Sequence, residues 1–312
     1  MAALTAPLAS LPLRFHVIGR GAMAARMRVL TGDVAIEDAE AVYIASRNRD
    51  HAAQTRAALE AGKAVLCEKP CVTDPAELGD LIALSQRHRL LYMEAVATPF
   101  LPAVAAALHA ADTGRLGRLA HVEASFGYPV ARARAPRLFD ADGGVLADRA
   151  VYPLMLALIA LGPVRAMDCT VERDRRGVDV AARLRLDHRA GGTSDLAVSF
   201  LARLDNSLRI EGDAGAVEVL PPLLTAQRLR FTGPAARAPA WWRRTRQNPL
   251  VRRLGDFGAR AAGRWHPLGA SPWLHELAHF TTLYRGGQIE SPIVGHARMA
   301  EAARLIGKAR GA

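Results

Sequence analysis

Residues 14–24 read RFHVIGRGAMA, and this stretch decides the fold of the first part of the chain. A short apolar run at 14–18 leads into a G-x-G-x-x-A turn, and a helix-like segment at 22–30 follows. In this context the first glycine permits a tight turn, and the second lets a pyrophosphate approach the N-terminus of the helix. The stretch therefore predicts a dinucleotide-binding unit. Its expected cofactor-binding residues are Gly19, Gly21, Ala22 and Met23.

Strand-like and helix-like segments alternate after this turn. Three further strands are predicted, at 42–45, 64–67 and 90–93. Helices are predicted between and after them, at 51–62, 75–88 and 101–112. Such alternation with short loops indicates a parallel sheet covered on both faces. The predicted fold class of residues 14–118 is α/β, with a doubly wound, Rossmann-like parallel sheet that is shortened.

The pattern changes near residue 118. A long strand is predicted at 119–128 and a helix at 148–161. Apolar and polar residues then alternate over 178–187, which is typical of a strand with one buried face. Similar strands are expected at 196–200, 208–210 and 217–219, and closing helices at 272–285 and 296–309. Residues 119–312 are thus predicted to form an α+β substrate and oligomerisation domain with a large antiparallel sheet, whose terminal helices can pack back on the first domain.

The chain between the glycine turn and the second strand is short. A dinucleotide fold normally places a carboxylate about 20 residues after the turn, at the end of a second strand, where it binds ribose hydroxyls. Glu37 and Asp38 lie near that offset, but they directly precede the strand at 42–45. Either one of them binds the ribose or a strand–helix unit is missing. The choice between NAD and NADP is not predicted.

The third strand ends in Cys67-Glu68-Lys69-Pro70. Ligands of an open α/β sheet collect at the carboxyl ends of its strands. A lysine there can give a proton to a substrate oxygen, so Lys69 is the first catalytic candidate. Cys67 and Cys71 lack a second pair of metal ligands nearby and are expected to be buried thiols.

Several stretches, in order and spacing, resemble the Gfo/Idh/MocA family, named for glucose–fructose oxidoreductase, inositol dehydrogenase and a rhizopine catabolism protein. They are VYIAS at 42–46 with Asn48 and His51, ALEAGKAVLCEKP at 58–70, MEA at 93–95, FLP at 100–102, RLFD at 137–140, GGVLAD at 143–148, VYPL at 151–154 and ESP at 290–292. The resemblance covers nearly everything from residue 42 onward. The most similar branch is that of the sugar and dihydrodiol dehydrogenases, which has tyrosine where other branches have histidine.

This resemblance implies an oxidoreductase that uses NAD or NADP and acts on a small-molecule sugar, cyclitol or diol. Lys69 would be the proton donor or acceptor, and Asp148 and Tyr152 would line the substrate from one helical face. The remaining residues implied for the cofactor site are Ser46, Asn48, His51 and Glu68, together with Lys69 itself. Glu94 matches a pocket carboxylate, and it is expected to contact substrate.

The chain departs from the family pattern at two places. The first is the short segment after the glycine turn. The second is Arg149-Ala150, which replaces a small, glycine-containing pair, so Arg149 is expected either to crowd the pocket or to recruit an acidic substrate. A non-catalytic member that acts as a binding or regulatory protein is therefore the main alternative.

A second motif indicates different chemistry. His275-Glu276-Leu-Ala-His279 has the H-E-x-x-H spacing of zinc peptidases, which places two imidazoles on one helical face. A third ligand is not evident at the usual downstream positions. A zinc hydrolase is kept as a minor alternative, and the main prediction includes no metal.

The composition bears on whether the protein binds nucleic acid, spans a membrane or is stabilised by disulfides. The net charge is +11, mostly from arginine, and residues 237–265 are rich in arginine and tryptophan. No nucleic-acid motif accompanies this segment, so a solvated insertion or an oligomer contact is favoured. No stretch approaches the ~20 apolar residues of a membrane helix. Residues 1–13 are interpreted as a disordered leader, and three cysteines are too few for a disulfide framework. A cytoplasmic homo-oligomer, associated through the antiparallel sheet, is expected.

Overall fold

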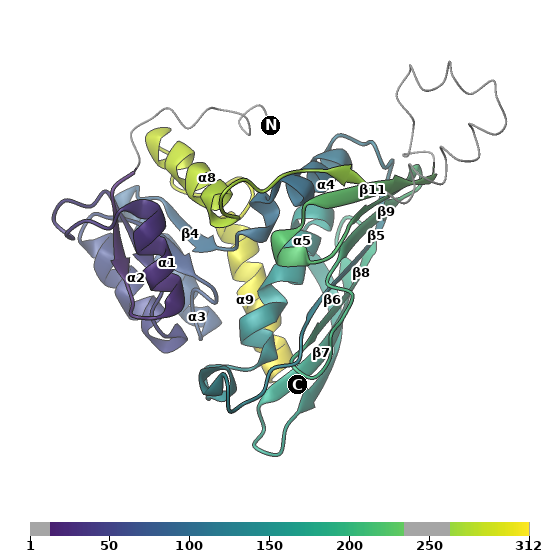
Figure 1. Ribbon diagram of the computed structural model, residues 1–312, viewed down its shortest axis with the longest axis horizontal. Coiled ribbons are helices and arrows are strands. Elements are labelled where there is room, and N and C mark those ends of the chain that lie inside the picture. The colour runs from purple at the N-terminus through teal and green to yellow at the C-terminus, as the bar shows by residue number, and fades with distance from the viewer. Residues whose placement is uncertain (1–12, 234–262, 312) are drawn as a thin grey trace.

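Two β-sheets organise the chain, and helices lie between them (Figure 1). The computed structural model describes residues 13–233 and 263–311. The smaller sheet is formed within the first hundred residues and the larger one within residues 119–265. Residues 1–12 of the predicted leader and most of the arginine-rich segment, at 237–262, lie outside the described residues. Leu13, the last residue of the predicted leader, is buried in the core.

The small sheet contains four parallel strands. In order across the sheet they are β1 (Phe15–Ile18), β2 (Ala41–Ile44), β3 (Ala64–Glu68) and β4 (Tyr92–Ala95). Every residue of β2 and β4 is buried, as expected for a parallel sheet with both faces covered. The connecting helices are α1 (Ala22–Thr31), α2 (His51–Glu60) and α3 (Pro75–His88). The predicted α/β class is confirmed.

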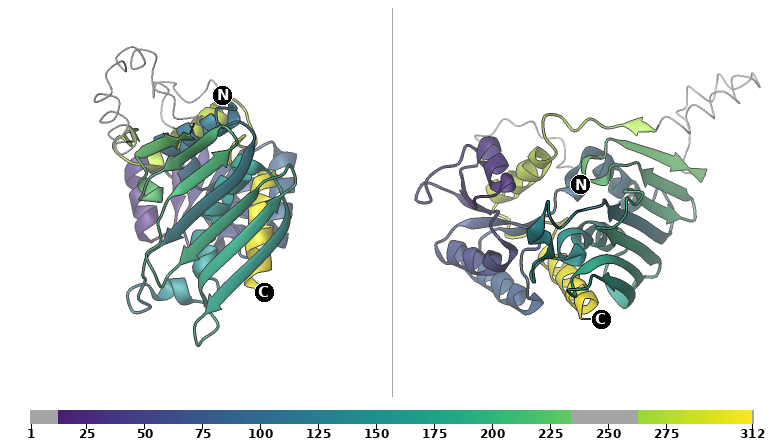
Figure 2. Two further views of the ribbon diagram at one scale, coloured as in Figure 1. Left: turned by 90° about the vertical axis from the view of Figure 1, so that its right-hand side faces the viewer. Right: turned by 60° about the horizontal axis from the view of Figure 1, so that its bottom comes forward.

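Helices cover both faces of this sheet. Helix α1 lies beside α8 (Trp273–Arg285) on one face, and α2 and α3 lie on the other (Figure 2). The guanidinium of Arg26 lies 4.2 Å from the ring centre of Trp273, and Phe280 packs against Phe15 of β1. The connections through α1 and α2 advance the chain by one strand in the same direction. Because α1 and α2 lie on opposite faces of the sheet, one of these crossover connections is right-handed and the other is left-handed. Parallel strands are usually joined by right-handed crossovers, so one connection is unusual.

A missing strand–helix unit explains this arrangement. A full dinucleotide-binding sheet continues on the far side of its first strand, where its order reverses. Here β1 pairs directly with β2 and is the edge strand of the sheet. Glu37 and Asp38 lie in the turn that leads into the amino end of β2, opposite the carboxyl edge. Neither residue therefore lies at the carboxyl edge, where a ribose-binding carboxylate is expected, and the alternative of a missing strand–helix unit is favoured.

The exposed edge of β1 is satisfied by the chain's own side chains. Asp33 Oδ1 accepts a hydrogen bond from the Val17 amide at 2.9 Å. Arg28 Nη2 donates to the carbonyl oxygens of Val17 and Gly19, both at 2.8 Å, and Arg28 Nε pairs with Asp33 Oδ2 at 2.9 Å. Unpaired edges are sites of unwanted strand pairing, and charged side chains on an edge oppose it. The edge left by the missing unit is thus closed locally.

The large sheet contains eight strands. Their order across the sheet is β12 (Arg264–Trp265), β11 (Arg228–Thr232), β10 (Gly215–Val219), β9 (Leu208–Gly212), β5 (Leu119–Gly127), β8 (Thr193–Ser199), β7 (Asp179–His188) and β6 (Val164–Arg173). The β5–β8 pair is parallel and the other pairs are antiparallel. The prediction omitted β6, β11 and β12. Edge strand β6 is mostly exposed and so lacks a clear hydrophobic alternation.

Helices α4 (Pro102–Asp112), α5 (Val151–Leu161) and α9 (His296–Arg310) contact the inner face of the large sheet. Helix α9 also packs against α3, so the end of the chain joins the two sheets. Short helical turns are η1 (Asn48–Asp50), η2 (Thr98–Phe100), η3 (Pro136–Phe139), the π-helical η4 (Leu146–Ala150) and η5 (Leu223–Thr225). Among the described residues, no helix has the length and apolarity needed to cross a membrane.

Candidate active site

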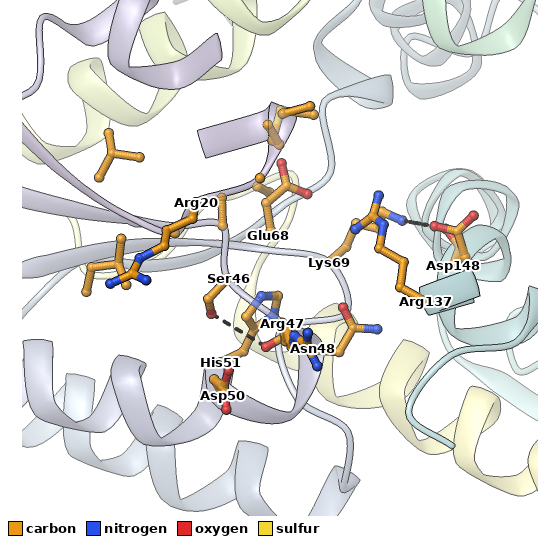
Figure 3. Close-up of a pocket in the computed structure, with 18 of the residues that line it drawn as sticks. Arg20, Ser46, Arg47, Asn48, Asp50, His51, Glu68, Lys69, Arg137 and Asp148 are labelled. Atoms are coloured by element: carbon orange, nitrogen blue, oxygen red, sulfur yellow. Dashed lines mark hydrogen bonds and ion pairs between the residues drawn. The ribbon is translucent and has the colours of Figure 1, made fainter. Parts of the chain in front are cut away.

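A cavity of about 1070 Å³ lies at the carboxyl ends of the parallel strands, where the small sheet faces the second half of the chain. Figure 3 shows Arg20 of the glycine turn at one end and Asp148 at the other, with Glu68 and Lys69 between them. All the residues predicted to bind cofactor line this cavity: Gly19, Gly21, Ala22, Met23, Ser46, Asn48, His51, Glu68 and Lys69. The structure thus brings together residues that are up to fifty positions apart.

The glycine turn forms an anion cradle. Gly19 has a φ of 134°, and a Cβ there would lie 2.3 Å from the Ala45 carbonyl oxygen, so only glycine fits. Gly21 precedes α1, and a Cβ on it would meet no atom within 4 Å. The first turn of α1 contains no acidic residue. Free amides at an open helix N-terminus suit a phosphate group, so the turn fits the pyrophosphate of a dinucleotide.

Lys69 follows β3 and reaches across to the second half of the chain. Its Nζ donates to the carbonyl oxygen of Asp148 at 2.6 Å and to the carboxylate Oδ1 at 2.7 Å. Burial disfavours the ammonium, but the negative charge of Asp148 outweighs this effect and the pKa of Lys69 is raised above its ordinary value. Burial likewise opposes ionisation of Asp148, yet Lys69 lowers the pKa of that carboxyl. The pair is therefore ionised at neutral pH.

Asp148 and Tyr152 come from consecutive helical segments. Asp148 lies in the π-helical turn Leu146–Ala150, and Tyr152 lies in the first turn of α5. The Tyr152 ring centre is 5.3 Å from Lys69 Nζ, and both residues line the cavity. Burial raises the pKa of the Tyr152 phenol despite the nearby ammonium, so the hydroxyl remains protonated. Rare π-turns often occur at functional sites, and this one was not predicted.

Several cavity residues hold neighbouring segments in place. His51 Nδ1 bonds to the Pro70 carbonyl at 2.8 Å and so fixes the loop that carries Lys69. Asn48 Nδ2 donates to the carbonyl of Asp142 at 3.0 Å, which joins the two halves of the chain. Ser46 Oγ donates to Gln54 Oε1 at 2.6 Å.

The two residues predicted to contact substrate, Glu94 and Arg149, do not line the cavity. Glu94 is buried and accepts a hydrogen bond from the Cys71 amide at 2.9 Å, outside the cavity. Arg149 is only 5% exposed, and it donates to the carbonyl oxygens of Tyr128 and Ser199 on the large sheet. Arg149 stands where the family pattern has a small residue, and it was expected either to crowd the pocket or to recruit an acidic substrate. Its side chain instead turns away from the cavity. Its Nε lies 3.7 Å from Asp148 Oδ2 and so supports that carboxylate.

Several residues that line the cavity were not predicted to do so, among them Arg137, Trp273 and Glu276. Arg137 belongs to the matched RLFD stretch, lies beside the Lys69–Asp148 pair and lowers the pKa of Asp148 (Figure 3). Trp273 and Glu276 enter from α8. The RLFD stretch at 137–140, which resembles the family, could have identified Arg137 as a site residue.

The H-E-x-x-H motif does not form a zinc site. His275 Nε2 bonds to the Leu268 carbonyl at 2.9 Å, whereas His279 Nε2 bonds to Ser291 Oγ at 2.9 Å. Burial lowers the pKa of His279 to about 4. Within residues 13–233 and 263–311, no group of three potential ligands has the arrangement of a metal site. The two imidazoles of the motif thus bind different partners within the fold and do not converge on a common site.

Comparison with known proteins agrees with this geometry. Residues 14–96 match a sequence profile described as the oxidoreductase family with an NAD-binding Rossmann fold, and residues 104–218 match the GFO/IDH/MocA C-terminal domain. Trans-1,2-dihydrobenzene-1,2-diol dehydrogenase from Bos taurus is 31% identical over 198 residues. That match covers 63% of this chain but only 59% of the bovine protein, which is less than two thirds of its length.

Two solved structures have the same fold. Aldose-aldose oxidoreductase from Caulobacter crescentus has a TM-score of 0.76 at 22% identity, and the match covers 96% of this chain and 98% of that one. A 3-ketoreductase from Actinomadura kijaniata, in complex with NADP and TDP-benzene, has a TM-score of 0.72 at 22% identity, with the same coverage. The two profiles together span most of the described chain, in the order of the two sheets. The chain therefore belongs to the Gfo/Idh/MocA oxidoreductase family and has its NAD-binding Rossmann fold.

Proposed function

We propose that the protein is an NAD(P)-dependent oxidoreductase that acts on a secondary alcohol or carbonyl carbon of a sugar, cyclitol or diol. The observation that supports this most strongly is the ionised Lys69–Asp148 pair in the same cavity as the glycine turn. A nicotinamide, when bound, supplies or accepts the hydride. The chain's own residues bind, orient and manage the proton.

The residues present fit such a cofactor. The turn at Gly19 and Gly21 would hold the pyrophosphate at the N-terminus of α1. Residues at the ends of β2 and β3, from Ser46 to Lys69, would line the path toward the second half of the chain. Any Cβ at position 19 would clash with the Ala45 carbonyl oxygen, so glycine is required at this turn, which supports the proposal.

The proton is assigned to Lys69. As an ammonium it donates a proton to the oxygen of a carbonyl that is being reduced and becomes a neutral amine. In the reverse direction the neutral amine accepts the proton of the alcohol as the hydride leaves. Asp148 holds Nζ in position, and the neutral Tyr152 hydroxyl provides a further hydrogen bond for the substrate. Arg137, which also lines the cavity, adds a positive charge at this end.

Lys69→Met tests this role, because methionine retains the apolar stem and removes the ammonium. We expect turnover of any sugar, cyclitol or diol substrate to fall about 10²–10⁴-fold, the usual contribution of a general acid or base. The dissociation constant for NADH or NADPH should change little. Lys308→Met, on α9 and outside the cavity, is the matched control. Unchanged turnover in Lys69→Met would remove the proton-transfer role.

The rival function is that of a binding or regulatory protein that kept the fold and lost the cofactor. The intact Lys69–Asp148 pair favours the enzyme, since a binding protein has no need of an ionised pair at this position. The two functions differ in whether a dinucleotide binds. A cytoplasmic location and a homo-oligomer associated through the large sheet remain predictions.

A further inference from the structure

Glu276, the central acid of the H-E-x-x-H motif, lines the cavity that the fold builds for a dinucleotide. Glu276 is only 1% exposed, and its Oε1 atom is buried without a hydrogen-bond partner among the described residues. A buried carboxyl oxygen left without a partner costs about 1–3 kcal/mol. An unsatisfied acid at the wall of a cavity therefore indicates that a ligand group completes it.

The position of Glu276 lies between the two ends of the cavity. Trp273, one turn earlier on α8, lines the cavity beside Arg26 of α1, close to the glycine turn. On the other side, Glu276 is close enough to Glu68 to be influenced by its charge, and Glu68 directly precedes Lys69. A dinucleotide with its pyrophosphate at the turn and its reacting ring at Lys69 must pass this residue.

The chemistry of the neighbours leaves Glu276 neutral. Burial, and then the negative charge of Glu68, raise the pKa of Glu276 well above its ordinary value. The hydroxyl of Tyr43 already donates to Glu68 Oε1 at 2.6 Å, so it satisfies the other acid. A protonated carboxyl presents one O–H donor and one carbonyl acceptor side by side.

We propose that Glu276 binds the carboxamide of the nicotinamide, with its hydroxyl donating to the amide oxygen and its carbonyl accepting from the amide nitrogen. A carboxamide presents an acceptor and a donor with the complementary spacing. The ring's reacting carbon is adjacent to this substituent, so the contact also orients the ring toward Lys69. This assignment rests on the proposed function, because it requires a dinucleotide in the cavity.

Two variants and two ligands test the assignment by equilibrium binding. Glu276→Leu removes both polar groups, whereas Glu276→Gln keeps one donor and one acceptor. Calorimetric titration with NADH or NADPH should show binding at least about tenfold weaker in Glu276→Leu and within about threefold of native in Glu276→Gln. ADP-ribose, or its 2′-phosphate if NADPH is preferred, lacks the nicotinamide and should bind all three proteins alike.

A ligand change gives the same test without a mutation. The nicotinic acid dinucleotide replaces the carboxamide by a carboxylate, which has no N–H for the Glu276 carbonyl oxygen and brings a buried negative charge toward Glu68. The native protein should therefore bind it at least about tenfold more weakly than the oxidised nicotinamide dinucleotide. Equal loss of ADP-ribose binding in Glu276→Leu, or no loss for either ligand, would overturn the assignment and leave the proposed function standing. Native protein that binds neither dinucleotide nor ADP-ribose would overturn both.

Discussion

The two ends of the cavity differ: one lies next to the shortened edge of the small sheet, and the other contains the Lys69–Asp148 pair. At the glycine turn, the sheet lacks the strand that normally holds the adenosine ribose, and Arg28 and Asp33 satisfy the edge of β1 instead. At the other end, Lys69, Asp148 and Tyr152 are complete and packed across two halves of the chain. The chain thus lacks a strand at the end of the cavity near the glycine turn, whereas the cluster of Lys69, Asp148 and Tyr152 at the other end is intact.

The two ends of the cavity are also held in place by different kinds of contact. The Lys69 end depends on contacts between distant segments, such as the hydrogen bond from Asn48 to Asp142. The turn end depends on local backbone geometry and on one short-range ion pair. Substitutions at the turn should therefore affect folding first, and substitutions at the Lys69 end should affect chemistry first.

The largest expected effect at the turn comes from Gly19→Ala. The φ of 134° is unfavourable for alanine, and its Cβ would overlap the Ala45 carbonyl, so we expect unfolding to become easier by about 3 kcal/mol or more. Urea unfolding measures this change. Gly21→Ala is the matched control, since its φ is −83° and its Cβ meets open space. Equal losses in the two variants would contradict the account of this turn.

A smaller effect is expected at the closed edge of β1. Asp33→Ala leaves the Val17 amide and Arg28 Nε without their acceptor and places alanine at a φ of 27°. We expect the free energy of unfolding to fall by about 1–3 kcal/mol. Asp33→Asn should lose less, because it keeps an oxygen for Val17 and tolerates the positive φ.

An exposed ion pair on the large sheet serves as a control for the Arg28–Asp33 pair at the edge of β1. Arg185 and Asp195 pair across β7 and β8 at 3.7 Å, but their side chains are 62% and 48% exposed. Arg185→Ala should change the free energy of unfolding by no more than about 0.5 kcal/mol. If this exposed pair contributed as much as Asp33, the special role of the β1 edge would be lost.

The pH dependence of catalysis tests the other end. Lys69 must be protonated to donate during carbonyl reduction, and Asp148 raises its pKa. Asp148→Asn removes that charge, so the alkaline limb of the kcat/KM profile should move to lower pH by about one unit or more. Arg137→Gln, which alters charge without touching the lysine, is the comparison variant. An unmoved limb in Asp148→Asn would separate Asp148 from the proton step.

Local sequence patterns predicted much of this molecule. The period-two alternation located the buried strands of the large sheet, and the glycine spacing located the turn, because both depend on neighbouring residues. The pattern could not show that Arg149 bends back to the Tyr128 carbonyl, or that Glu94 faces Cys71, because those outcomes depend on tertiary packing. The zinc-like motif misled for the same reason: its imidazoles find different partners in three dimensions.

The most direct test of the central claim is calorimetric titration of the whole protein with NADH and, separately, NADPH. We expect micromolar binding of at least one of them, since the glycine turn and the cavity that leads to Lys69 are both intact. The preferred dinucleotide then fixes the cofactor for the substrate survey. Binding of neither would contradict the proposed oxidoreductase and leave a binding protein with the fold of this family.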